Sequence, residues 1–300
     1  MKKVLIRLMS ALILFLTFAG TIQAQESNAP AEERKSLLWK AVPDTGEMTI
    51  YIYGTMHLIP KDDFHLGAGL KKAFFASDVL VMELELNEES MMRAMGKMWL
   101  PGGQTLEDIM QMEAFDSLKS YLLDTLQMED LQYKMAIRMK PFLATQLFYG
   151  DMMGDSPASF ELTFKSMADS AGMDITGLET IEEQIAVIDS IPLDEQIDML
   201  MQGVRGENEF GDEFETMIAI YKSQNLDSLY GFMMKDSSGM MDYENVLLRK
   251  RNENWVERIA GFEEKKVYFI AVGAGHLAGP YGLLHLLEER AYKVVPLSTE

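Results

Sequence analysis

Two short motifs that each end in a histidine are the part of this chain best suited to chemistry. They read Gly-Thr-Met-His at 54–57 and Gly-Ala-Gly-His at 273–276, and they take two of only four histidines. Each follows a run with the pattern of a buried β-strand, at 48–53 and at 266–272. Because glycine at a strand end permits a sharp turn and a close backbone approach, each motif can place an imidazole at the rim of a sheet. Two such imidazoles on neighbouring strands would supply half of a metal site.

A carboxylate that could complete this site lies on the next strand pattern along the chain. Glu83 is near the end of the run 78–85, so it reaches the same edge of the sheet if the strands are parallel. His57, Glu83 and His276 would then form a two-histidine, one-carboxylate site with an open position for a water molecule. These donors suit a divalent ion, and ligand type alone does not separate zinc, manganese, cobalt and iron.

Two alternatives stay open on the residues alone. Glu85 follows Glu83 by two positions on the same face of the strand, so it could be the ligand instead. A buried histidine at a strand end can also serve only to hydrogen-bond the backbone, and the two motifs would then be structural.

The strand patterns that must position these residues lie at both ends of the chain. A hairpin at 36–53 opens the fold, a helix is expected at 67–76, and the third strand follows at 78–85. The stretch from about 88 to 261 has helical periodicity, with one short strand pattern at 174–178. A strand, a helix at 280–290 and a closing strand at 292–296 end the chain. We therefore predict an α/β fold, a single domain over 36–300 whose central sheet combines N- and C-terminal strands around a large helical insertion.

The first 24 residues have the three-part pattern of a secretory signal peptide. Two lysines precede an apolar stretch at 4–18, and small and polar residues lead to a cleavage position after Ala24. The uninterrupted apolar run after Arg7 is shorter than the roughly 20 residues that span a bilayer, although an uncleaved anchor is the alternative. Residues 25–35 are polar and are expected to form a flexible tail. We expect an exported protein, periplasmic or extracellular, with no stable membrane span once the signal is removed.

Composition excludes several classes of function. The formal net charge is −20, so nucleic acid is not an expected partner because both surfaces would be negative. The chain has no cysteine, which excludes disulfides, thiolate metal ligands and cysteine nucleophiles. The fold must therefore be stabilised by burial alone.

Together these motifs resemble the TraB/GumN family, which includes the TIKI-type metalloproteases. The matching segments cover nearly all of the chain after residue 35 and fall in the family order: 38–40, 52–58, 78–83, 177–184, 251–255 and 273–284. The resemblance implies that His57, Glu83 and His276 form the metal site of a metal-dependent peptidase. It also favours Glu83 over Glu85 as the ligand.

Further residues are candidates for supporting roles. Glu179 ends the short strand pattern and could be catalytic or hold a metal ligand in place. The neighbouring Thr-Ile-Glu-Glu at 180–183 has the form of a helix capping box, which is a structural explanation for that segment. The resemblance suggests that Arg251 and Asn252 reach the site to bind substrate or to orient a carboxylate, whereas a surface salt bridge is the alternative. His65 and His285 are expected not to be ligands.

Two classes of function fit these residues. The first is an exported metal-dependent hydrolase, most concretely a peptidase acting on a peptide or protein, in which Glu83 ligates the ion or serves as general base. The second is a non-catalytic protein that binds a metal or metallocofactor through the same histidines and engages a partner through its acidic surface. An open coordination position favours the first class, and saturated coordination or haem-like absorbance would favour the second.

Overall fold

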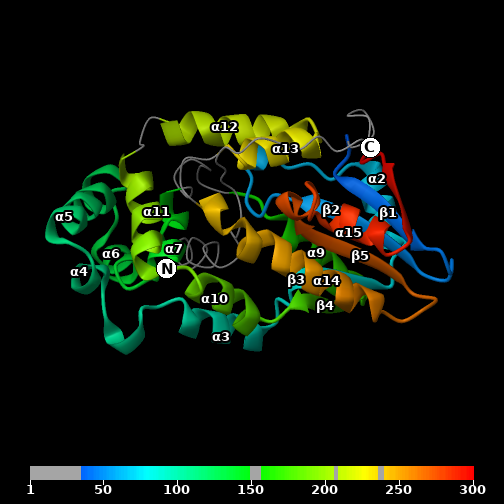
Figure 1. The fold of residues 1–300 in the computed structure, drawn as a ribbon, viewed down its shortest axis with the longest axis horizontal. Helices are drawn as coiled ribbons and strands as arrows, with labels where there is room; N and C mark the ends of the chain where they lie inside the picture. Colours follow the sequence, from blue (N-terminus) through cyan, green and yellow to red (C-terminus); the bar gives the residue numbers. More distant parts are fainter. Residues whose placement is uncertain (1–34, 149–156, 206–208, 236–239) are drawn as a thin grey trace. The chain divides into compact units, whose positions relative to one another are not determined.

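The structure is a computed structural model, and it describes residues 35–148, 157–205, 209–235 and 240–300 (Figure 1). These residues gather into two compact units. The sheet unit comprises the described residues 35–86, Ala158–Thr180 and Thr216–Glu300. The helical unit comprises Asn87–Pro157 and Ile181–Glu215. The predicted signal peptide and residues 25–34 of the predicted tail lie outside the described residues, and a single domain over 36–300 stays a prediction.

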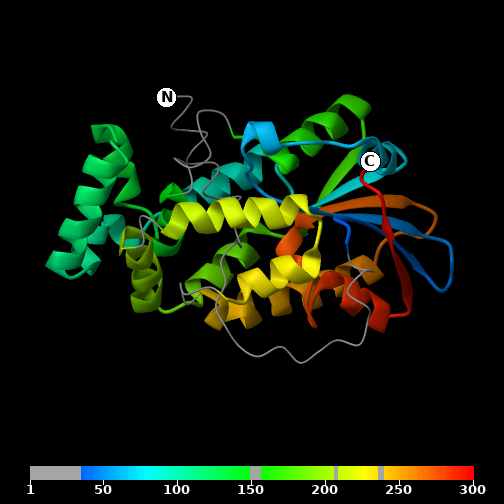
Figure 2. The ribbon, with the colours of Figure 1, turned by 90° about the horizontal axis from the view of Figure 1, so that it is seen from above.

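The sheet unit is built on a six-stranded mixed sheet in the order β4-β3-β5-β2-β1-β6 (Figures 1 and 2). Its strands are β1 Leu38–Pro43, β2 Thr49–Thr55, β3 Val79–Leu84, β4 Asp174–Glu179, β5 Val267–Gly273 and β6 Tyr292–Leu297. The four strands β4, β3, β5 and β2 are parallel, whereas β1 runs antiparallel to both β2 and β6. The sheet thus joins both ends of the chain, and the predicted α/β fold class is confirmed.

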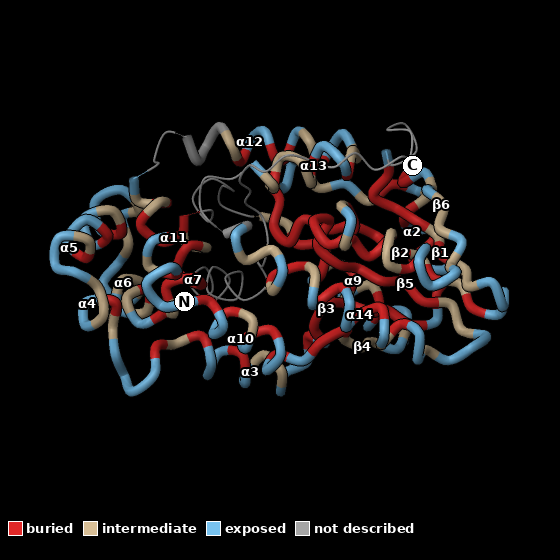
Figure 3. The backbone as a smooth tube through the Cα atoms, in the orientation of Figure 1, coloured by how far each residue is buried: buried red, intermediate tan, exposed pale blue. Residues whose placement is uncertain are grey.

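The central strands are long apolar runs because both of their faces are covered. Every residue of β3 is buried, and so is nearly all of β5 (Figure 3). Successive side chains of a strand point to opposite faces. On one face, Phe269 of β5 contacts Phe74 at 5.2 Å and Phe164 at 5.1 Å between ring centroids, which holds two helices against the sheet. On the other face, Tyr268 stacks on Phe262 at 4.3 Å.

The helices of the sheet unit lie on these faces and around the ends of the strands. They are α2 Ala68–Phe75, α9 Phe160–Ala171, α13 Leu226–Met233, η4 Met240–Tyr243, the π-helical η5 Asn245–Arg249, α14 Lys250–Ala260, η6 Ala274–His276 and α15 Leu283–Glu289, with the short η1 Lys61–Asp63. Part of the predicted helical stretch therefore belongs to the sheet unit. This part includes α9, which precedes β4, and α13, η4, η5 and α14 later in the chain, whereas α10, which follows β4 directly, belongs to the helical unit.

The helical unit contains the remaining helices. They are α3 Glu88–Lys97, η2 Pro101–Gly103, α4 Leu106–Ile109, α5 Met112–Ser120, η3 Tyr121–Thr125, α6 Asp130–Ala136, α7 Pro141–Ala144, α10 Ile181–Asp189 and α11 Leu193–Arg205, while α12 Glu209–Lys222 crosses into the sheet unit. Gly203 of α11 lies so close to Phe148 that an added Cβ would be 2.3 Å from its ring, so these two segments need a glycine at their contact. Among the helices of the described ranges, none has the length and apolar character needed to cross a bilayer.

Candidate functional site

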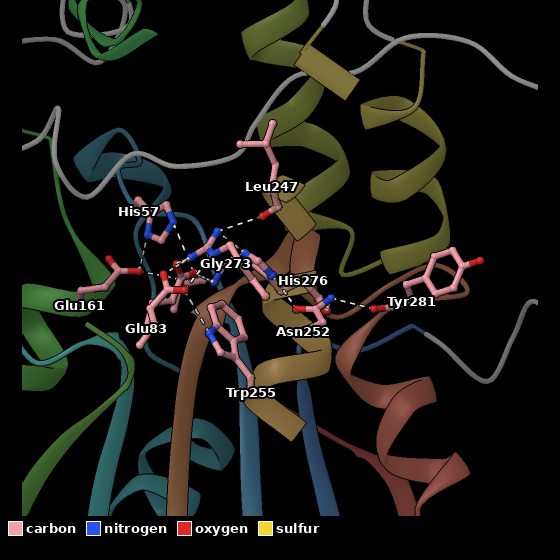
Figure 4. Close-up of polar contacts among 12 residues, drawn as sticks. His57, Glu83, Glu161, Leu247, Asn252, Trp255, Gly273, His276 and Tyr281 are labelled. Carbon is pink, nitrogen blue, oxygen red and sulfur yellow. Dashed lines mark hydrogen bonds and ion pairs between the residues drawn. The ribbon is translucent and has the colours of Figure 1, made fainter. Parts of the chain in front are cut away.

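The two histidine motifs lie side by side at one edge of the sheet. Strands β2 and β5 are parallel neighbours, with Thr55 paired to Gly273 at their ends. His57 follows β2 by two residues, and His276 closes η6 directly after β5. Both imidazoles are buried, at 8% and 0% exposure. The structure therefore brings together the two residues that the sequence placed on separate strand ends (Figure 4).

Glu83 of β3 lies between these histidines. Its Oε1 is 3.8 Å from Nε2 of His57 and 4.0 Å from Nε2 of His276, and it accepts a hydrogen bond of 2.8 Å from the backbone N–H of Gly273. Glu85 comes after the end of β3 and is exposed. Of the two carboxylates weighed from the sequence, Glu83 is the one that the structure places beside both imidazoles.

Each imidazole is held through Nδ1, so its Nε2 is left for the centre of the site. Nδ1 of His57 is 2.8 Å from Oε1 of Glu161, and Nδ1 of His276 is 2.7 Å from Oδ1 of Asn252. Asn252 also donates to the backbone carbonyl of His276 at 3.2 Å, which fixes the orientation of its amide. This arrangement, in which an oxygen acceptor holds one ring nitrogen and the other faces a carboxylate, is typical of histidines that bind metal.

Arg251 of α14 joins the remaining polar groups. Its Nε and Nη2 donate to the two carboxylate oxygens of Glu179 at 3.0 and 2.6 Å, and Nη2 also donates to Oε2 of Glu83 at 2.7 Å. Its Nη1 lies 3.0 Å from Nε2 of His276 and 3.1 Å from the carbonyl oxygen of Leu247. The alternative weighed for Arg251, a salt bridge on the surface, does not hold, since the guanidinium is 3% exposed and paired with two buried carboxylates.

A π-helical segment immediately precedes this arginine. Because η5 has more residues per turn than an α-helix, it changes the direction in which the side chains of the following helix point. π-Helical segments are frequent at functional sites. Arg251, Asn252 and Trp255 all lie on the buried face of α14. The indole N–H of Trp255 donates to Oε2 of Glu179 at 3.3 Å, and its ring packs against His276 at 4.3 Å between centroids.

Burial and neighbouring charge shift the two histidines in opposite directions. Burial and the Arg251 guanidinium hold the pKa of His276 well below its usual range, so its imidazole is neutral. Burial also lowers the pKa of His57, but the Glu161 and Glu83 carboxylates outweigh it and raise this pKa to about 9. Burial raises the pKa of Glu179 despite the opposing effect of Arg251.

The other two histidines, which are expected from the sequence not to be ligands, are far less buried. His65 lies in a loop with its side chain 69% exposed, and it is 3.4 Å from the carboxylate of Glu300. His285 lies on α15 at 40% exposure and is 3.4 Å from the carboxylate of Glu289.

Comparison with known proteins shows the family of this chain. The model of the TraB/PrgY/gumN family matches residues 37–296. This chain belongs to that family. The family member described here is 26% identical to metalloprotease TIKI1 of Danio rerio over 325 residues, which cover 89% of this chain and 64% of the relative. It is 24% identical to human metalloprotease TIKI1, with 87% and 62% covered, and 23% identical to metalloprotease TIKI2 of Xenopus tropicalis, with 88% and 60% covered. The chain thus spans less than two thirds of each relative's length, and no solved structure matches it.

Metalloprotease relatives imply a metal ion, and the chemical types of the donors His57, Glu83 and His276 in this TraB/PrgY/gumN protein suit one. Two donors that each bind an ion at about 2.1 Å can be at most about 4.2 Å apart, and both Nε2 atoms lie within this limit of Glu83 Oε1. Gly273 leaves the space next to them open, because an added Cβ would be 3.3 Å from Nε2 of His57 and 3.4 Å from Oε1 of Glu83. In the described part of the chain, no three histidine, aspartate or glutamate side chains are arranged closely enough to hold a metal ion as they stand. A metal ligated by His276 would have to replace the contact of its Nε2 with Arg251.

Filling the space at Gly273 should therefore weaken metal binding. In Gly273→Ala the new methyl group would crowd both Nε2 of His57 and Oε1 of Glu83, and disturbed surroundings of metal ligands typically lower metal affinity by about 10- to 100-fold. The backbone at this position, φ −52° and ψ 134°, suits any residue, so the melting temperature should change little. Calorimetric titration with Zn²⁺ and a thermal melt measure the two effects. Gly231→Ala is the control, because no atom lies within 4 Å of its added Cβ, and equal metal affinity in both variants would contradict the expectation.

Proposed function

We propose that this protein is an exported metal-dependent hydrolase, most concretely a peptidase acting on a peptide or protein substrate, with its divalent ion held by His57, Glu83 and His276. A metal in this position would supply a polarised water and would stabilise negative charge on the scissile carbonyl. The donor set does not choose among zinc, manganese, cobalt and iron.

The observation that carries this proposal is the charge balance of the buried site. Among the described residues, the buried aspartate, glutamate, lysine and arginine side chains are four in number, and all of them meet here: Glu83, Glu161, Glu179 and Arg251. Three carboxylates face a single guanidinium. Buried net charge is costly unless it is compensated. In the metal-free site a proton on His57, whose pKa is raised to about 9, offsets part of this excess. A divalent cation that takes the place of that proton would, together with Arg251, balance the three carboxylates.

The residues of the chain would divide the remaining tasks. Glu83 either ligates the ion through Oε1 or takes a proton from the attacking water, since its carboxylate lies beside both histidines. Arg251 has a permanent positive charge next to Glu83 and is suited to bind a substrate carbonyl as negative charge develops on it. Glu179 holds that guanidinium through two of its nitrogens, so we assign it a supporting role in preference to a catalytic one.

Substrate class and export are also part of this proposal. The relatives are named metalloproteases, which supports peptides or proteins as substrates. Residues 1–24 have the pattern of a signal peptide, which supports a mature chain beginning at Gln25.

One experiment on the secreted protein tests the proposal. Intact mass should correspond to a chain that begins at Gln25, and elemental analysis should find about one divalent ion per chain. A peptide library should be cleaved, and a chelator should stop the cleavage until metal is restored. Bound metal without cleavage of any peptide, or a haem-like absorbance, would favour the non-catalytic binding protein instead. A full-length mass in the membrane fraction would show that the apolar segment is an anchor.

A further inference from the structure

We propose that Glu161 is a positioning residue of the metal site, which acts through His57 to aim its Nε2 at the ion and to strengthen it as a ligand. This inference rests on the proposed function. The sequence offered no indication of it, because an acidic residue in the first turn of a helix is already explained by the helix dipole.

The carboxylate of Glu161 is fixed from three directions. Its Oε1 accepts hydrogen bonds from Nδ1 of His57 at 2.8 Å and from the hydroxyl of Thr55 at 2.6 Å. Its Oε2 accepts a hydrogen bond from the hydroxyl of Ser159 at 3.0 Å. Thr55 and His57 lie on the same strand end, so one carboxylate oxygen ties the start of α9 to the motif that carries the ligand. The side chain is only 5% exposed.

Capping of α9 does not account for this buried charge. Ser159 is the N-cap residue and its hydroxyl accepts a hydrogen bond from the backbone N–H of Leu162. The cap would therefore persist without a carboxylate at position 161. An ionised carboxylate is costly to bury unless a partner compensates its charge, and for Glu161 that partner is the imidazole of His57.

The Nδ1 atoms of His57 and His276 have different hydrogen-bond partners, so the two imidazoles differ in strength as metal ligands. Nδ1 of His57 faces an anion, whereas Nδ1 of His276 faces the neutral amide of Asn252. A carboxylate both orients an imidazole and raises its basicity, while an amide only orients it. Nε2 of His276 also contacts the cationic Arg251. His57 is thus the stronger ligand of the pair, and Glu161 is the residue that makes it so.

The test compares Glu161→Gln and Glu161→Ala with the wild type in calorimetric titrations with Zn²⁺ and Co²⁺. Glutamine keeps the shape and one acceptor oxygen but loses the charge, so affinity should fall about 10-fold; alanine also loses the orientation and should cost about 100-fold. The matched control is Tyr221→Phe. It removes a buried hydroxyl that donates to the backbone oxygen of Gly54 at 3.0 Å, in the same motif, yet leaves the pair of His57 and Glu161 in place. Its affinity should equal that of the wild type.

A second measurement does not depend on bound metal. In side-chain ¹⁵N NMR of the metal-free protein, Nδ1 of His57 should carry a proton that exchanges slowly with water. This signal should be lost in Glu161→Ala and kept in Tyr221→Phe. If Glu161→Ala binds metal like the wild type, or if Tyr221→Phe loses as much affinity, the inference is overturned. If the wild type binds no divalent ion, the proposed function fails, and the NMR signal alone then decides whether Glu161 positions His57.

Discussion

Replacement of His276 by alanine is expected to abolish stoichiometric binding of a divalent ion and any peptidase activity while the protein stays folded. The variant loses one of the three donors, and Arg251 and Asn252 lose the ring that they contact. Truncation of a fully buried ring costs about 2–4 kcal/mol of unfolding free energy, which is smaller than the stability of a typical domain, about 5–15 kcal/mol. Elemental analysis, a peptide-cleavage assay and a circular dichroism melt measure the three effects.

The chain contains its own controls for this prediction. His65→Ala and His285→Ala remove exposed imidazoles outside the site and should leave metal content and cleavage unchanged. Glu83→Gln is the sharper probe, because it keeps the shape of the side chain but removes the charge needed for ligation or proton transfer. Full metal occupancy in His276→Ala, with loss of metal in His65→Ala, would show that the two motifs are structural.

Replacement of Arg251 by methionine is expected to destabilise the protein more than any other single change of charge. It would leave the buried carboxylates of Glu83 and Glu179 without their shared partner. Breaking a buried ion pair by removal of one side typically costs about 3–5 kcal/mol, because the remaining charge is neither hydrated nor paired. Urea denaturation of the metal-free protein, followed by circular dichroism, measures this loss of unfolding free energy.

Arg249→Met is the matched control for that experiment. Arg249 lies two residues earlier, pairs with Glu253 at 2.9 Å on the surface and packs over Tyr281, so its loss should have a much smaller effect. The double variant Arg251→Met with Glu179→Gln should recover part of the lost stability, since one of the unpaired charges is then absent. Equal destabilisation by Arg251→Met and Arg249→Met would show that the buried pairs contribute no more than a surface pair.

Several features of the fold follow from short-range patterns. The hairpin, the strand that contains Glu83 and the strand before His276 are apolar runs bounded by turn residues, and each is found where the sequence predicted it. The short strand pattern at 174–178 is confirmed as β4. Differences at the ends of elements are small, as for α15, which begins at Leu283 instead of about 280, because a Gly-Pro-Tyr-Gly turn at 279–282 precedes it.

The sequence by itself determined which side chains stand at the strand ends, because strand periodicity and the glycine before each histidine are local properties. Only the tertiary structure decided their partners. The pairing of β2 with β5 joins segments from opposite ends of the chain, and it brings His57 and His276 to the same edge. The contacts of Glu161 with His57 and of Arg251 with Glu83 also join distant residues. Such contacts depend on the order of strands and the packing of helices on them, so no local pattern encodes them. In the sequence, Glu161 at the start of a helix and Arg251 within a helix have the pattern of surface residues, and only the tertiary structure shows that both are buried.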